Sequence, residues 1–134
     1  MARLTETFST YALALLRLVA GFMLALHGAQ KLFGAFGGMG GSGAQAAMFS
    51  LFWFGAVIEL LGGSLIALGL FTRPVAFLLC GEMAFAYFRF HFPKGFLPIV
   101  NGGEIAVLYC FVFLFLFAKG PGNCSLDRIR GKAN

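Results

Sequence analysis

The stretch LALLRLVAGFMLALHGAQKLFG, residues 13–34, decides the fold class of this chain. It is long and apolar enough to cross a bilayer, because a membrane-spanning helix needs about 20 mostly apolar residues. It nevertheless carries Arg17, His27 and Lys31 among its leucines and phenylalanines. We therefore expect a membrane-spanning helix whose charged side chains turn away from lipid.

The composition of the whole chain supports a membrane protein. Of its 134 residues, 60% are hydrophobic and 11% are charged, and the mean hydropathy is +0.88. Soluble domains are about half apolar and roughly one quarter charged, so this chain has too few polar residues to cover a water-facing surface. Four apolar stretches are candidate spans: residues 11–33, 48–71, 74–90 and 99–118. Because lipid offers no partners to unpaired backbone groups, each must be helical, which predicts an all-α integral membrane fold. We expect one four-transmembrane-helix bundle that occupies residues 1–134 as a single domain.

The placement of lysine and arginine predicts the orientation of this bundle. With four spans, both termini lie on one side of the membrane. That side collects Arg3, Arg73, Lys119, Arg128, Arg130 and Lys132, whereas the other collects Lys31, Arg89 and Lys94. The more positive side is normally cytoplasmic, so both termini are predicted to be cytoplasmic. The net charge of +5 is then a topology signal, and membrane lipid rather than nucleic acid is the expected partner.

Two flanking segments carry further expectations. The connection at 89–104 is rich in aromatic residues and holds two prolines, so we expect it to dip into the membrane interface and fold back over the outer end of the bundle. An aromatic membrane belt is the simpler interpretation of the same residues, and it places His91 in the interface. The tail at 125–132 is predicted to form a short basic surface helix.

Each predicted span contains one ionisable residue inside its apolar run: Arg17, Glu59, Glu82 and Glu104. A charge near the bilayer centre costs about 2.5–3.5 kcal/mol on insertion scales, so these side chains should face the bundle interior. In the first span the spacing of Arg17, Gly21, Leu24, Gly28 and Lys31 traces one helical stripe. Its glycines allow a second helix to approach closely. We expect the long Arg17 side chain to reach Glu59 or Glu82, either as part of a site or as an ion pair that fixes helix register.

These residues define a candidate polar pocket. Burial and mutual repulsion disfavour charge on the interior carboxylates, so Glu59 and Glu82 are candidates for proton exchange at neutral pH. The candidate ligand-binding residues are Arg17, His27, Lys31, Arg89 and Glu104.

The remaining chemistry-bearing residues are sparse. No CxxC motif links Cys80, Cys110 and Cys124, so the sequence does not support a dithiol relay. The two histidines, His27 and His91, stand in unlike surroundings, which makes haem a minor alternative. The sequence predicts no metal site and no intrinsic cofactor.

Three segments together resemble the DoxX family of small bacterial membrane proteins. They are LRLVAGFMLALHGAQKLFG (16–34), ELLGGSLIALGLFTRP (59–74) and NGGEIAVLYCFVFLFLFAKGPGNCSLD (101–127). The resemblance implies a four-helix protein of the bacterial inner membrane. Some members of that family are the membrane subunit of thiosulfate:quinone oxidoreductase. Others are linked with thiol and oxidative-stress systems, including a membrane complex with sulfurtransferase and superoxide dismutase.

Three functions fit these observations. The leading hypothesis is a membrane subunit of a quinone-linked or thiol-linked redox system, at most one subunit of an oxidoreductase, that holds a quinone or similar ligand while a partner supplies the redox centre. The second is a small-solute or proton-coupled transporter, which would need to oligomerise through the glycine-rich faces at 21–28 and 62–69. The third is a non-catalytic membrane anchor that recruits soluble partners through its basic tail.

Overall fold

The computed structural model describes residues 1–131, and this part of the chain is almost entirely helical. The four long helices are α1 (Ala2–Phe33), α2 (Leu51–Leu68), α3 (Thr72–Ala86) and α5 (Glu104–Lys119). The short elements are η1 (Ala35–Gly37), the π-helical turn η2 (Tyr87–His91), η3 (Phe92–Lys94), α4 (Pro98–Asn101) and α6 (Leu126–Ile129). Lys132, which the sequence places among the cytoplasmic charges, lies outside the described residues.

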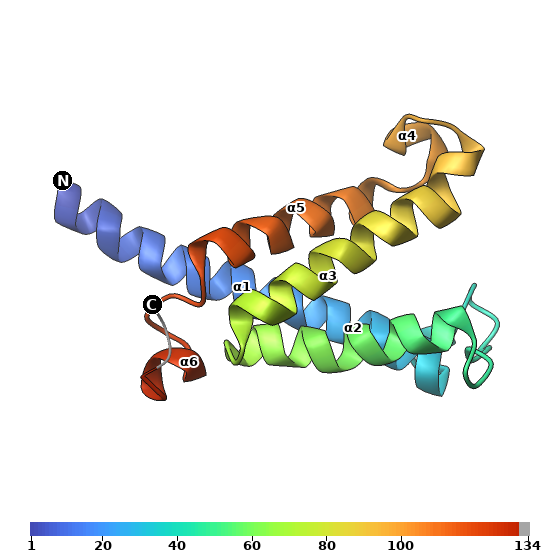
Figure 1. Cartoon of the computed structure of the whole chain (residues 1–134), viewed down its shortest axis with the longest axis horizontal. Helices are drawn as coiled ribbons and strands as arrows, with labels where there is room; N and C mark the ends of the chain where they lie inside the picture. Colours follow the sequence, from blue (N-terminus) through green and yellow to red (C-terminus); the bar gives the residue numbers. More distant parts are fainter. Residues whose placement is uncertain (132–134) are drawn as a thin grey trace.

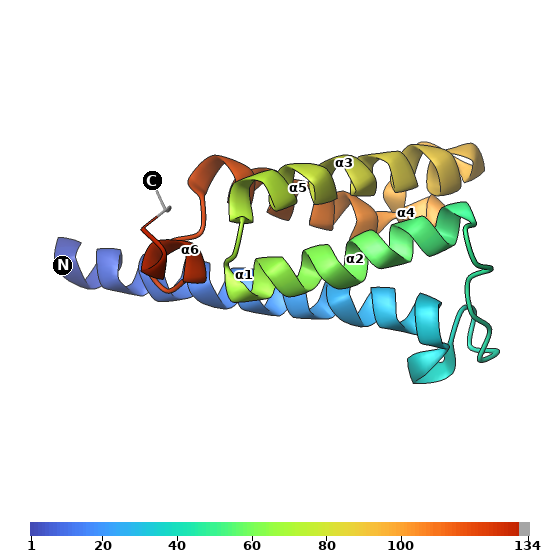
Figure 2. The same ribbon diagram turned by 60° about the horizontal axis from the view of Figure 1, so that its bottom comes forward.

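The long helices form two antiparallel pairs. Helix α1 packs along α2, and α3 packs along α5 (Figure 1). The tight turn at 69–71 joins the pairs, and from there α3 diverges from α2 toward the end that carries α4 (Figures 1 and 2). This divergence separates the middles of α2 and α3, where the candidate site lies.

Glycine brings α1 and α2 into backbone contact. A Cβ atom added at Gly21 would lie 2.5 Å from both the Gly63 carbonyl oxygen and the Ala67 nitrogen. One added at Gly28 would lie 2.5 Å from the Leu60 nitrogen. Only glycine permits this approach, which confirms the predicted stripe as the face that α1 presents to α2.

The long helices have the length and the apolar surface that membrane-spanning helices need. Within residues 1–131, three helical stretches are long and apolar enough to cross a bilayer: Ala2–Phe33, Leu51–Leu68 and Thr72–Lys94. Large apolar side chains such as Phe22, Phe85 and Leu108 are exposed along the long helices, as expected of surfaces that face lipid. The fourth span and the cytoplasmic position of the termini stay predictions.

The predicted span at 99–118 is not one helix. It divides into α4 and α5 at Gly102 and Gly103, where Gly102 has a left-handed φ of 73°. The side-chain oxygen of Asn101 accepts a hydrogen bond from the Gly103 N–H at 2.8 Å, which stabilises the break. Helix α5 consequently has only 16 residues, fewer than the about 20 of a typical span. The preceding connection curls back at the ends of α3 and α5 (Figure 1), and its place in the membrane interface stays a prediction.

Arg17 occupies a different position from the one expected, because it does not pair with Glu59 or Glu82. Its guanidinium donates from Nη1 to the carbonyl oxygens of Ile66 and Ala67, both at 2.9 Å, and from Nη2 to that of Cys124. The last carbonyl groups of a helix lack the usual hydrogen-bond donor within the helix. The Arg17 side chain, which comes from α1, lies at the end of α2 and donates hydrogen bonds to two of these carbonyl groups. Arg17 is therefore a buried structural residue, 3% exposed, that ties the tail to α2.

Asp127 attaches the same tail to α3. Its Oδ1 accepts from the Phe71 N–H at 2.8 Å and its Oδ2 from the Thr72 N–H at 2.9 Å, so the carboxylate caps the N-terminus of α3. Its own N–H donates to the Gly69 carbonyl at 2.9 Å. The predicted short helix of the tail is present as α6, and Asp127 docks it onto the α2–α3 turn.

Protonation of Asp127 should weaken this docking. Burial alone would raise the pKa of the carboxyl, but the N–H groups of Thr72 and Phe71 outweigh burial and hold the pKa below its ordinary value of 3.8. The stabilisation is therefore complete above about pH 4 and is lost as the pH falls toward the folded-state pKa. We expect Asp127→Asn to cost about 1 kcal/mol at pH 7 and to reduce the destabilisation that acid causes. Thermal unfolding in detergent at pH 7 and pH 3 measures both effects.

The exposed carboxylate Glu6 provides the control for that measurement. Glu6→Gln should leave the unfolding temperature and its pH dependence close to wild type. Equal behaviour of Asp127→Asn and Glu6→Gln would contradict the capping role.

Candidate functional site

An ion pair between α1 and α2 is the centre of the candidate site. The Lys31 ammonium lies 2.8 Å from both carboxylate oxygens of Glu59. Glu59 is 6% exposed, so its carboxylate is shielded from water and the Lys31 ammonium balances its charge. The close approach of the two helices at Gly28, one turn before Lys31, sets this geometry. The sequence predicted that Arg17 would neutralise an interior carboxylate, but Lys31 neutralises Glu59 instead.

Glu82 reaches the same region from α3. Its side chain lines the same cavity as those of Lys31 and Glu59, so the three groups belong to one site. Its Oε2 is buried without a hydrogen-bond partner. Its Oε1 lies only 3.2 Å from the place that a Cβ would occupy at Gly55. Gly55 thus leaves room for the Glu82 carboxyl.

A cavity of about 680 Å³ lies beside these groups, between α2 and α3. This volume is within the range of about 300–1,000 Å³ that is typical of small-molecule sites. Its apolar lining comes mainly from aromatic and aliphatic residues of α2 and α3, with four polar side chains. The lining residues are Lys31, Leu51, Phe52, Phe54, Gly55, Ile58, Glu59, Phe77, Leu78, Gly81, Glu82, Phe85, Ala86, Phe90 and His91.

His91 is the polar cavity residue that was not among the site residues predicted from the sequence. It ends the π-helical turn η2, and π turns are frequent at functional sites. Its Nδ1 lies 3.2 Å from the Asn101 carbonyl oxygen. Because a carbonyl only accepts, Nδ1 carries the hydrogen and Nε2 is left as the acceptor nitrogen. A π turn has no clear signature in the sequence, so the direction of His91 could not be read there.

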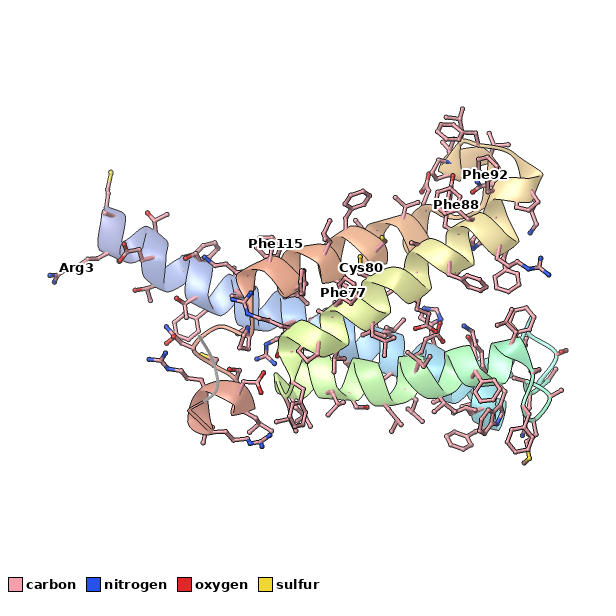
Figure 3. The ribbon with its side chains drawn as sticks, viewed as in Figure 1. Arg3, Phe77, Cys80, Phe88, Phe92 and Phe115 are labelled. Carbon is pink, nitrogen blue, oxygen red and sulfur yellow. The ribbon has the colours of Figure 1, made fainter. Side chains whose placement is uncertain are left out.

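Asn101 fixes the segment that positions His91. Its side-chain amide donates to the Gly95 carbonyl at 2.7 Å and to the Tyr87 hydroxyl at 3.2 Å. The Tyr87 hydroxyl in turn donates to the Phe96 carbonyl. These bonds tie η2 to the connection that leads into α4. Figure 3 shows Phe88 and Phe92 of this segment gathered near α4, at the far end of the molecule from Arg3.

The other predicted site residues lie elsewhere. His27 is exposed on the face of α1 toward α5, with its ring centroid 6.4 Å from that of Tyr109. It borders a separate groove of about 430 Å³ between α1 and α5. Arg89 is exposed and places its guanidinium 5.5 Å from the centroid of the Phe90 ring. Glu104 is exposed at the first position of α5, where the positive end of the helix dipole stabilises a carboxylate.

Of the seven predicted residues, Lys31, Glu59 and Glu82 come together around the cavity. This arrangement joins an apolar volume to a buried carboxyl group with an unused oxygen. Such a site can bind the apolar part of a ligand by contact with its walls and form a hydrogen bond with the ligand's polar group. It can also transfer a proton to or from that polar group.

The fold and this cluster define a helical membrane protein that keeps ionisable groups between its helices. The profile of the DoxX family matches residues 12–92, which contain most of α1 and all of α2, α3 and η2. The chain belongs to the DoxX family, as its sequence motifs predict. A relative from Haemophilus influenzae, described as an uncharacterized protein, is 46% identical over 125 residues, which cover 91% of this chain and 92% of the relative. No solved structure matches this chain.

Proposed function

We propose that this protein is an inner-membrane subunit of a quinone-linked redox system and that the cavity between α2 and α3 binds the quinone. The observation that carries this proposal is the unpartnered, buried Glu82 Oε2 beside an aromatic cavity of about 680 Å³. A quinone has the matching chemistry, since its flat, apolar ring suits aromatic walls and its carbonyl oxygens accept hydrogen bonds. A protonated Glu82 would donate to such a carbonyl.

The chemistry of quinone reduction then assigns roles to the cluster. Conversion of a quinone to a quinol takes up two electrons and two protons. In this proposal a partner subunit supplies the electrons, while Glu82 delivers a proton to the nearer carbonyl oxygen and is reprotonated through the cluster. Glu59 is the second carboxylate, held by Lys31, and the Lys31 charge offsets the negative charge that Glu82 gains when it loses its proton. At the cavity wall, the acceptor nitrogen Nε2 of His91 can accept a hydrogen bond from the hydroxyl that forms at the other end of the ring, where solvent supplies the second proton.

A larger side chain at Gly81 tests the cavity directly. Gly81 lines the cavity, and a Cβ added there meets no heavy atom within 4 Å, so Gly81→Leu fills the space without straining the fold. Binding of a short-chain quinone analogue to the purified protein can be followed by quenching of Trp53, the single tryptophan, whose neighbours Phe52 and Phe54 line the cavity. We expect saturable quenching that Gly81→Leu weakens at least about tenfold, or about 1.4 kcal/mol.

The control for cavity filling is Ala118→Leu, which adds the same side chain to the exposed end of α5. It should bind the quinone analogue as wild type does. Equal affinity in both variants, or quenching that never saturates in wild type, would show partition into the detergent and would overturn the proposal.

Glu82→Gln tests the proton-exchange role of Glu82. In the quenching assay this variant should retain binding, because the amide can still donate a hydrogen bond. Quinol production by the assembled complex, measured separately, should fall.

A further inference from the structure

Two cysteines from different helices are in contact inside the apolar part of the fold. Cys80 of α3 and Cys110 of α5 place their sulfur atoms 3.7 Å apart, and both thiols are free. Figure 3 shows Cys80 on the side of α3 that faces α5. The two residues are 30 positions apart in the chain and form no CxxC motif. The packing of α3 against α5 brings them together, so the sequence alone did not reveal the pair.

The surrounding helices hold this contact in place. Both cysteines pack against the core cluster, whose members Leu79 and Phe113 are fully buried beside them. Toward the α2–α3 turn, the rings of Phe77 and Phe117 bridge the same two helices, with centroids 5.3 Å apart. A disulfide needs a sulfur–sulfur distance of about 2.05 Å, so closure requires the two sulfurs to approach by about 1.7 Å from their present contact.

The environment of the pair decides which oxidant can reach it. Cys80 lies about 12 Å along α3 from Thr72, which places it well inside the apolar zone. The neighbouring Phe77 and Phe111 are 64% and 62% exposed, as expected of a surface that faces lipid. Water-soluble thiols and oxidants enter such a zone poorly, whereas an apolar quinone dissolves in it.

We propose that Cys80 and Cys110 form a dithiol–disulfide redox site whose electron acceptor is a lipid-soluble quinone. In the oxidation each thiol loses its hydrogen, one sulfur–sulfur bond forms, and two electrons and two protons pass to the two carbonyl oxygens of the quinone, which becomes the quinol. The disulfide covalently joins α3 to α5.

This site is separate from the α2–α3 cavity and goes beyond the function proposed for it. The α3 residues that line the cavity include Gly81, Glu82 and Phe85, whereas Cys80 packs toward α5. The dithiol could therefore be oxidised by a quinone that diffuses in the membrane even if the cavity holds another ligand. The competing interpretation is that both cysteines are only small apolar residues of the core, and that interpretation predicts no closure.

The first experiment tests closure. In a Cys124→Ser background, which removes the exposed third thiol, the purified protein is treated with copper–phenanthroline, denatured and labelled with a maleimide. We expect a monomer that takes up no label, has lost the mass of two hydrogen atoms, and regains both labels after dithiothreitol. The matched control adds Cys80→Ser and Leu78→Cys, which keeps two thiols on α3 and α5 but turns one toward the cavity. Full labelling of the Cys124→Ser protein, or equal closure in the control, would overturn the proposal.

The second experiment tests the acceptor. Anaerobic Cys124→Ser protein is mixed with a ubiquinone analogue whose ring is fully substituted, so that thiols cannot add to an unsubstituted ring carbon. We expect one quinol for each disulfide formed, and none from the protein that also carries Cys110→Ser. Closure with copper–phenanthroline but not with the quinone would overturn the assignment of the acceptor. Gly81→Leu separates this site from the cavity, because it should weaken quinone binding there while the yield of disulfide stays unchanged.

Discussion

Gly28→Ala is expected to separate α1 from α2 and to lower the free energy of unfolding by about 3 kcal/mol, at the upper end of the usual cost of overpacking. The added methyl carbon would lie 2.5 Å from the Leu60 nitrogen and 2.6 Å from the Ala56 carbonyl oxygen. Both are backbone atoms in the middle of α2, so neither can rotate away as a side chain would. The helices must move apart, and with them Lys31 and Glu59. Unfolding in detergent, titrated with dodecyl sulfate and followed by circular dichroism, measures the loss.

Gly81→Ala is the matched control for this prediction. It makes the same substitution within a helix, but its methyl group meets no heavy atom within 4 Å. Alanine favours helix over glycine by about 0.8–1.0 kcal/mol, so this variant should be as stable as wild type or more stable. If the two variants lost equal stability, the close contact of α1 with α2 would not be what makes Gly28 necessary.

Lys31→Met is expected to have the second large effect, a loss of about 3–5 kcal/mol, because it leaves the buried Glu59 charge without a partner. The long, apolar methionine occupies much of the space of the lysine stem, so the loss reports the missing charge rather than a hole. Lys94→Met is the control, since Lys94 is exposed on η3 and its removal should change stability little. The same detergent unfolding assay applies.

The double variant Lys31→Met, Glu59→Gln shows whether the cost comes from the pair. Removing both charges abolishes the uncompensated carboxylate, so the double variant should recover most of the stability that Lys31→Met loses. If the losses of the two single variants simply added, Lys31 and Glu59 would contribute independently and the ion pair would not be the basis of the site.

The sequence predicted well those features that follow from local periodicity and from the cost of charge in lipid. The spacing of Gly21, Gly28 and Lys31 indicated one face of α1, and that face is the contact with α2. The presence of Glu59 and Glu82 inside apolar runs predicted that they would converge, and both border one cavity.

Features that depend on the ends of helices could not be predicted in the same way. Arg17 and Glu59 looked like partners because their charges are opposite, but the carbonyls at the end of α2 compete for an arginine and lie closer to it. His91 joins the cavity only because α3 changes to a π turn at Tyr87–His91. Contacts between distant segments, such as that of Cys80 with Cys110, leave no pattern in the spacing of residues.

The docking of the tail has a consequence for biosynthesis. Arg17 is synthesised 107 residues before Cys124, whose carbonyl is one of its acceptors, and α3 receives its cap from Asp127, which also follows late in the chain. The contacts of Arg17 and the cap of α3 therefore stay incomplete until residues 124–127 have been synthesised. A nascent chain that stops before residue 124 would lack one of the three carbonyl acceptors of the Arg17 guanidinium.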